Sequence, residues 1–156
     1  MRVALIAVGH RLPAWAETAV ADYAKRLPAE MAFVIKAIKA EPRSSGKPPA
    51  ALMAAEATRI RTAIPKGARC VVFDERGTRV DTVTLAQRLR VWQSEGRDLA
   101  LLMGGADGLD PQLKAAADET LRLSDLTLPH ALARVLLVEA LYRAWTVSIG
   151  HPYHRE

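Results

Sequence analysis

Cysteine is almost absent from this chain of 156 residues, where Cys70 stands alone. A single cysteine excludes an intrachain disulfide and is compatible with a reducing compartment. Long apolar runs are missing too: the opening VALIAV is short, and no stretch approaches the roughly 18 residues of a membrane span. The chain also lacks a GxGxxG fingerprint and a P-loop, which disfavours dinucleotide and triphosphate sites. We expect a cytoplasmic protein with no membrane contact and a single domain over residues 1–156.

What remains is the composition of an ordinary globular protein. Hydrophobic residues make up 50% of the chain and charged residues 25%. The formal net charge is +5 and the sequence pI about 9.7, which favours polyanionic partners without identifying one. On charge alone, RNA binding and mere solubility both stay open.

Strand-like and helix-like segments alternate along almost the whole chain. Runs such as CVVF and ALLM, apolar on both faces, are typical of strands buried in a parallel sheet. This alternation predicts an α/β fold with a mainly parallel sheet. The expected strands cover 2–8, 31–39, 68–75, 98–105 and a short stretch from 120. The expected helices cover 13–27, 51–64, 85–93 with Thr84 as its cap, 112–118 opened by Asp110 and Pro111, and 129–145.

Two segments are candidate walls of a ligand pocket. Gly104 and Gly105 follow a predicted strand directly, and glycines at such a strand end let the backbone approach a flat ligand. Between a short strand and a helix start, the segment 123–130 offers the side chains of Ser124, Asp125 and Thr127. A sharp turn without a ligand, and ordinary caps and turns, explain the same residues equally well.

The final helix and the tail carry the remaining polar candidates. Arg134 falls on the polar surface of the helix, and Glu139 and Arg143 form an i,i+4 pair there, which also fits a solvated face. The breadth of the apolar surface suits a helix that packs on its own fold and on a second subunit. Pro152 makes helical metal-ligand spacing unsuitable for His151 and His154, so no metal is expected. The tail suits RNA instead, through Tyr153, His154 and Arg155.

The segment 41–50 concentrates proline, serine and glycine together with Arg43 and Lys47. This composition predicts a loop. It fits a solvated connection or, alternatively, a mobile basic lid.

Four stretches of the sequence together resemble one known family. VALIAVGHRLPAW, LLMGGADGL, LSDLTLPHALARVLLVEALYRAW and the terminal GHPYHRE resemble the ribosomal RNA large subunit methyltransferase H family, in the SPOUT superfamily. The resemblance covers essentially the whole chain. It implies an α/β fold with a C-terminal trefoil knot, a homodimer, and S-adenosylmethionine as methyl donor. The implied reaction methylates N3 of a pseudouridine in 23S rRNA of the assembled 70S ribosome.

The resemblance also implies roles for individual residues. Family members often have Pro-Glu at the positions of Ala106 and Asp107, and a leucine at Phe73, so a direct role for the Asp107 carboxylate is in doubt. The implied cofactor contacts are Phe73, Gly104, Gly105, Ser124, Asp125, Leu126, Thr127, Leu128 and Pro129. The implied RNA contacts are Arg134, Arg143, Tyr153, His154 and Arg155, and the catalytic candidates are Tyr153, His154, Arg155 and Glu139.

Attack by N3 requires loss of its weakly acidic proton, so a base or a field that favours the anion is expected to help. His154, Arg155 and Glu139 are the candidates for this role, and none is singled out. The rival interpretation is a ribosome-binding or RNA-binding module that performs no chemistry.

Overall fold

Five parallel strands form the centre of the protein in the computed structural model, which describes residues 1–9 and 11–155. His10 and Glu156, which belong to the terminal motifs, lie outside the described residues. The strand order is β2-β1-β4-β3-β5, and each strand pairing is parallel. The prediction of a mainly parallel α/β sheet is therefore confirmed, and the trefoil knot stays a prediction of the resemblance. The strands are β1 (Val3–Val8), β2 (Val34–Ile38), β3 (Arg69–Arg79), β4 (Leu99–Met103) and β5 (Glu119–Arg122).

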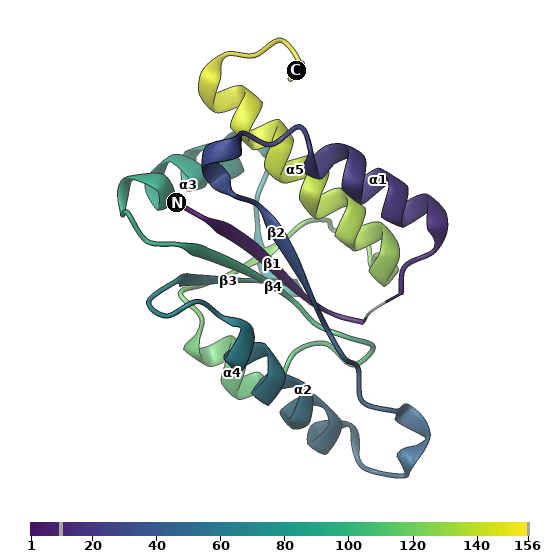
Figure 1. Cartoon of the computed structure of the whole chain (residues 1–156). Coiled ribbons are helices and arrows are strands. Elements are labelled where there is room, and N and C mark those ends of the chain that lie inside the picture. Colours follow the sequence, from purple (N-terminus) through teal and green to yellow (C-terminus); the bar gives the residue numbers. More distant parts are fainter. Residues whose placement is uncertain (10, 156) are drawn as a thin grey trace.

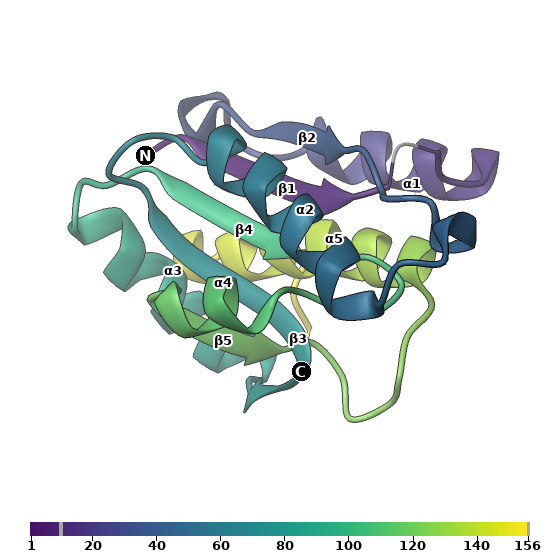
Figure 2. The ribbon, with the colours of Figure 1, turned by 90° about the horizontal axis from the view of Figure 1, so that it is seen from below.

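Helices cover both faces of the sheet, as expected for parallel strands that are apolar on both sides. Figures 1 and 2 show α1, α3 and α5 on one face and α2 and α4 on the other. The helices are α1 (Ala14–Ala24), α2 (Pro49–Ala63), α3 (Thr82–Ser94), α4 (Pro111–Ala116) and α5 (His130–Ile149). Short 3-10 helices are η1 (Ala29–Met31) and η2 (Arg43–Ser45).

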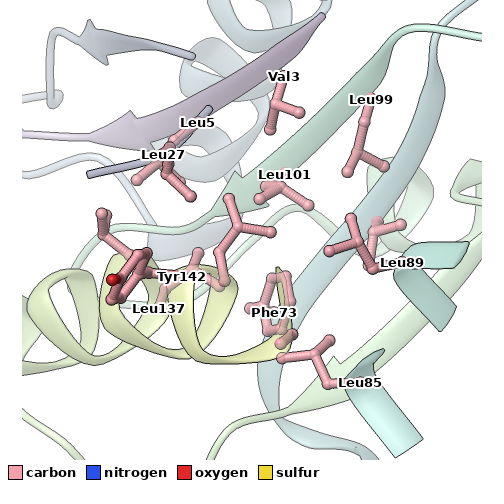
Figure 3. Close-up of a cluster of buried hydrophobic side chains, with 14 of the residues drawn as sticks. Val3, Leu5, Leu27, Phe73, Leu85, Leu89, Leu99, Leu101, Leu137 and Tyr142 are labelled. Carbon is pink, nitrogen blue, oxygen red and sulfur yellow. The ribbon is translucent and has the colours of Figure 1, made fainter. Parts of the chain in front are cut away.

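Side chains on the two faces of the central strands belong to two separate apolar clusters. Leu5 and Leu101 point into the cluster under α1, α3 and α5, where Leu137 and Tyr142 of α5 meet them (Figure 3). The neighbouring Ile6, with Leu102 on β4, points into the cluster under α2 and α4. This alternation follows from the two-residue period of a strand. The contacts of Leu137 and Tyr142 in the first cluster hold α5 against the sheet.

The edge strand β2 is less buried than its sequence suggested. Val34 is 48% exposed and Ile35 is 39% exposed, although the segment is apolar on both faces. The strand pairs only through β1 among the described residues, so its outer edge has no neighbouring strand.

Several element limits differ from the predicted ones. Asp81 caps α3, because its side chain accepts a hydrogen bond from the Thr84 backbone N–H at 2.7 Å; the prediction of Thr84 as the cap is wrong. The helix α2 begins at Pro49, which shortens the predicted loop. The helix α5 continues past Trp145 to Ile149. The strand β3 runs on to Arg79 through an irregularity after Phe73.

Candidate active site

A cavity of about 460 Å³ opens at the carboxyl edge of the sheet. Its walls are the irregular stretch of β3 that begins at Phe73, the loops that follow β4 and β5, and the first turn of α5. Ligands of open α/β sheets bind at this edge, and the volume lies within the usual range for small-molecule sites. Within the described chain, seven of the nine predicted cofactor contacts line it: Phe73, Gly104, Gly105, Ser124, Leu126, Thr127 and Leu128.

The other two predicted contacts lie beside the cavity and do not line it. Asp125 points to arginines, with Oδ1 3.0 Å from Arg122 Nη2 and Oδ2 3.5 Å from Arg79 Nε. Pro129 precedes α5 in an extended conformation and starts the helix. Both residues shape the loop between β5 and α5.

The glycine loop after β4 leaves no space for side chains. A Cβ on Gly104 would overlap the backbone of Gly108, so the chain can double back only with glycine there. The turn is closed by a hydrogen bond from Gly108 N–H to Gly105 O at 3.0 Å, and Gly108 has a φ of +84°. A backbone surface is thereby presented to the cavity, as the sequence indicated.

Charged side chains in the cavity wall escaped the sequence analysis. The Asp74 carboxylate lies 3.4 Å from Lys114 Nζ of α4, and its side chain is only 12% exposed. Glu75 accepts a hydrogen bond from the Thr127 hydroxyl at 3.4 Å, and this contact links the irregular part of β3 to the loop after β5. Their position in the sequence could have indicated them, because both acids follow the predicted buried strand CVVF immediately. Arg76, Arg122 and His130 complete the polar lining.

The tail folds back onto the middle of α5. Tyr153 donates its hydroxyl hydrogen to Glu139 Oε1 at 3.0 Å, and Arg143 donates to the same oxygen from Nε at 2.9 Å and from Nη2 at 2.6 Å. The Tyr153 ring meets Tyr142 edge-on, with centroids 4.6 Å apart, and the Arg143 guanidinium lies 5.1 Å from the centre of the Tyr153 ring. The structure thus brings together three of the predicted tail and helix residues.

The surroundings of Tyr153 disfavour ionisation of its hydroxyl group. Burial, followed by hydrogen bonding with Tyr23 and Glu139, raises the pKa of Tyr153 well above its ordinary value. Tyr153 therefore keeps its proton at neutral pH and acts as a donor. Beyond it, His154 is partly buried and Arg155 is exposed.

Arg134 does not lie on the exposed polar surface of the last helix, so that prediction is wrong. The residue is 6% exposed, and its guanidinium donates to Val8 O at 3.1 Å and to Gly9 O at 3.3 Å. Burial lowers its pKa from the usual arginine value. The helical pattern placed it off the apolar stripe, but the end of β1 occupies that side of the helix.

The cavity and the tail of one chain are separate. Of the described α5 residues, those lining the cavity lie in its first turn, His130 and Ala133, whereas Tyr153 contacts Glu139. Six residues of helix span roughly 9 Å along the axis. Figure 1 shows the C-terminus near the end of α5 that lies away from its first turn. The cavity lining and the tail contacts therefore lie at different positions along α5.

The described residues contain neither a membrane-spanning helix nor a cluster of metal-ligating side chains. Across residues 1–9 and 11–155, no helix combines the length and apolar character needed to cross a membrane. In the same residues, His, Cys, Asp and Glu side chains do not gather in threes that could hold a metal ion.

Comparisons with known proteins show which family has this sequence and this fold. A family model described as "Predicted SPOUT methyltransferase" matches residues 1–154. The parallel sheet, the glycine-walled cavity and this match define the class as a SPOUT methyltransferase. The chain is 67% identical to the ribosomal RNA large subunit methyltransferase H of Methylibium petroleiphilum and 66% identical to that of Leptothrix cholodnii, in each case over 100% of both chains. It belongs to the ribosomal RNA large subunit methyltransferase H family.

Solved structures share the fold at low sequence identity. A probable methylase family protein from Haemophilus influenzae Rd KW20 aligns with a TM-score of 0.56 and 16% identity, over 99% of this chain and 70% of that chain. A probable methyltransferase from Bordetella pertussis Tohama I gives a TM-score of 0.54 and 17% identity, over 92% and 95% of the two chains. Both support the same α/β architecture.

Proposed function

We propose that this protein transfers a methyl group from S-adenosylmethionine to N3 of a pseudouridine in 23S rRNA. The glycine-walled cavity at the carboxyl edge of the sheet carries the proposal, because it brings together Phe73 and the two loop segments that the sequence marked as candidate pocket walls. The substrate is the assembled 70S ribosome in the cytoplasm, as the family resemblance implies. The formal net charge of +5 favours recognition of the ribosome by charge.

The cavity suits S-adenosylmethionine chemically. Phe73, Met103 and Leu128 offer apolar surface for an adenine ring, while the Gly104 turn lets the backbone approach it closely. Asp74 and Glu75 provide carboxylates that can face a positively charged sulfonium, while Arg76, Lys114 and Arg122 balance their charge in the same wall. When bound there, S-adenosylmethionine supplies an electrophilic methyl group.

The chain's own residues bind, orient and deprotonate the base in this proposal. Tyr153 keeps its proton and presents an aromatic face for stacking, and Glu139 holds Tyr153 and Arg143 in place. Arg155 is exposed and free to approach a phosphate from solvent. His154 is our choice to move the N3 proton, because imidazole accepts and releases protons near neutral pH.

A homodimer would bring the cavity and the tail together. A two-fold axis that pairs two α5 helices antiparallel places the C-terminal end of one beside the first turn of the other, where the cavity opens. The surface available for such pairing has exposed apolar side chains on both α1 and α5. Trp15 is 56% exposed, Leu132 is 37% exposed, and Leu136, one turn further on, is 36% exposed. The helices that carry them lie side by side (Figure 1).

The decisive experiment incubates the purified protein with tritiated S-adenosylmethionine and 70S ribosomes that lack the modification. We expect label at N3 of one pseudouridine in the 23S rRNA. The His154→Ala and Arg155→Ala variants should each lose at least about tenfold in rate, because both touch the base or its phosphate. Arg90→Ala, an exposed arginine on α3, serves as the control for loss of positive charge.

Ribosome binding without label would favour the non-catalytic binding module. Full labelling by both tail variants would remove the tail from the mechanism. Binding of NAD or ATP in place of S-adenosylmethionine, measured by calorimetry, would contradict the choice of cofactor.

A further inference from the structure

A network of charged groups links the segment 41–48 to the glycine loop of the cavity. At its centre, Arg43 in η2 donates to Glu56 from Nη1 to Oε2 at 3.0 Å and from Nη2 to Oε1 at 3.2 Å. The Nε of the same guanidinium lies 2.8 Å from Asp107 Oδ2. One planar cation therefore bridges a carboxylate on α2 and a carboxylate in the loop 104–108.

Glu56 is the fixed end of this network. It is 2% exposed, and its Oε2 also accepts a hydrogen bond from the Glu41 backbone N–H at 2.9 Å. A buried carboxylate is tolerated only where donors compensate it, and here they all come from the segment 41–43. Arg43 donates in addition to the Glu41 carbonyl oxygen at 3.0 Å, so the segment is bound to itself as well as to α2.

The same carboxylate lies directly behind the cavity wall. A Cβ placed on Gly105 would be 3.5 Å from Glu56 Oε1 and 3.0 Å from a methyl group of Val8. The loop 104–108 therefore packs against the network from its rear, while its other side lines the cavity. Asp107 is 35% exposed in its side chain and provides the ion pair that connects this loop to Arg43.

We propose that Arg43 is a positioning residue: anchored on buried Glu56, it holds Asp107 and so fixes the glycine loop in the conformation that accepts the methyl donor. The assignment rests on the proposed function, since it takes the cavity to be the cofactor site. It gives the segment 41–48 a role other than a solvated connection or a basic lid over RNA. It also gives Asp107 a structural partner, which the shorter side chain at this position reaches.

The test measures S-adenosylmethionine affinity by calorimetry and steady-state kinetics with ribosomes for Arg43→Gln and Asp107→Asn. Each variant should raise Kd and KM for S-adenosylmethionine by about tenfold while leaving KM for ribosomes unchanged, because displacement of a binding loop by about 1 Å is costly. The double variant should be no worse than the worse single variant, since both remove one contact. Asp107→Glu, which keeps the carboxylate, should restore most of the affinity.

Lys47→Gln is the matched control, because Lys47 is an exposed cation of the same segment. A basic lid that binds RNA would lose ribosome affinity in both Lys47→Gln and Arg43→Gln; that result would overturn the proposal. Unchanged cofactor affinity in Asp107→Asn would overturn it too, even if Arg43→Gln failed to fold. If the wild-type protein itself binds no S-adenosylmethionine, the proposed function fails first, and that outcome is seen before any variant is compared.

Discussion

At the scale of single residues, Arg134 shows how a charged side chain serves the fold. It is buried at the end of β1, where its guanidinium donates to the carbonyl groups of Val8 and Gly9. A helical pattern assigns side chains to faces of one helix and contains no information about which strand end will meet each face. Its burial was therefore beyond prediction from the sequence, although the helix itself was predicted.

Replacement of Arg134 by methionine should destabilise the protein. The substitution keeps apolar volume but leaves the carbonyls of Val8 and Gly9 without their donor, which typically costs about 1–3 kcal/mol. Chemical denaturation monitored by circular dichroism measures the free energy of unfolding.

The control for this variant is Arg90→Met. Arg90 donates to the Ser148 carbonyl in an exposed position, and its loss should change the stability by less than about 0.5 kcal/mol. Equal effects of the two substitutions would show that burial of Arg134 contributes nothing to stability.

At the scale of elements, two glycines are required for different reasons: Gly67 for its backbone conformation and Gly104 for lack of space. Gly67 has a φ of +76° and open space around its Cα, whereas a Cβ on Gly104 would collide with the backbone of Gly108. Substitution at either position costs stability, but only the second moves a wall of the cavity.

We expect Gly67→Ala and Gly104→Ala to differ in their effect on cofactor binding. Gly67→Ala should lose about 1 kcal/mol of stability through its left-handed backbone and keep its affinity for S-adenosylmethionine. Gly104→Ala should lose more than about tenfold in affinity, because the loop must shift to accommodate the methyl group. Calorimetry and thermal unfolding measure the two quantities. Equal affinities of both variants would place the cofactor elsewhere.

Some elements could be predicted from the sequence and others could not. The buried strands β1 and β4 were correctly identified because their residues are apolar on both faces, and the glycine loop because it follows β4 directly. The continuation of β3 was not, because the bulge after Phe73 interrupts the apolar run and places polar residues in the strand. Asp74 and Lys114 meet across 40 positions, a contact that sequence spacing alone does not reveal.

At the scale of the whole molecule, the separation of cavity and tail makes one prediction about the assembly. A purified heterodimer of a Gly104→Ala subunit and a subunit carrying His154→Ala and Arg155→Ala should recover about half of the wild-type activity. In a two-fold dimer one of the two shared sites is then intact and the other carries both defects. Each mutant homodimer alone should keep less than about a tenth of the wild-type activity.

Co-expression with two different affinity tags isolates the heterodimer, and methyl transfer to ribosomes measures the rescue. The doubly tagged wild-type dimer is the control for effects of the tags. Stable heterodimers without activity would contradict a site shared between subunits.

The order of the strands also determines when the sheet can form during synthesis. The strand β1 pairs with the central strand β4, and the flanking residues Arg2 and Asp98, which are hydrogen-bonded to each other, lie 96 positions apart. At roughly 5–20 residues per second, translation of that interval takes about 5 to 20 s. Throughout this time β1 has only β2 as a possible neighbour, and the apolar faces of both strands lack much of their cover. We therefore expect the nascent chain to expose apolar surface until β4 has left the ribosome.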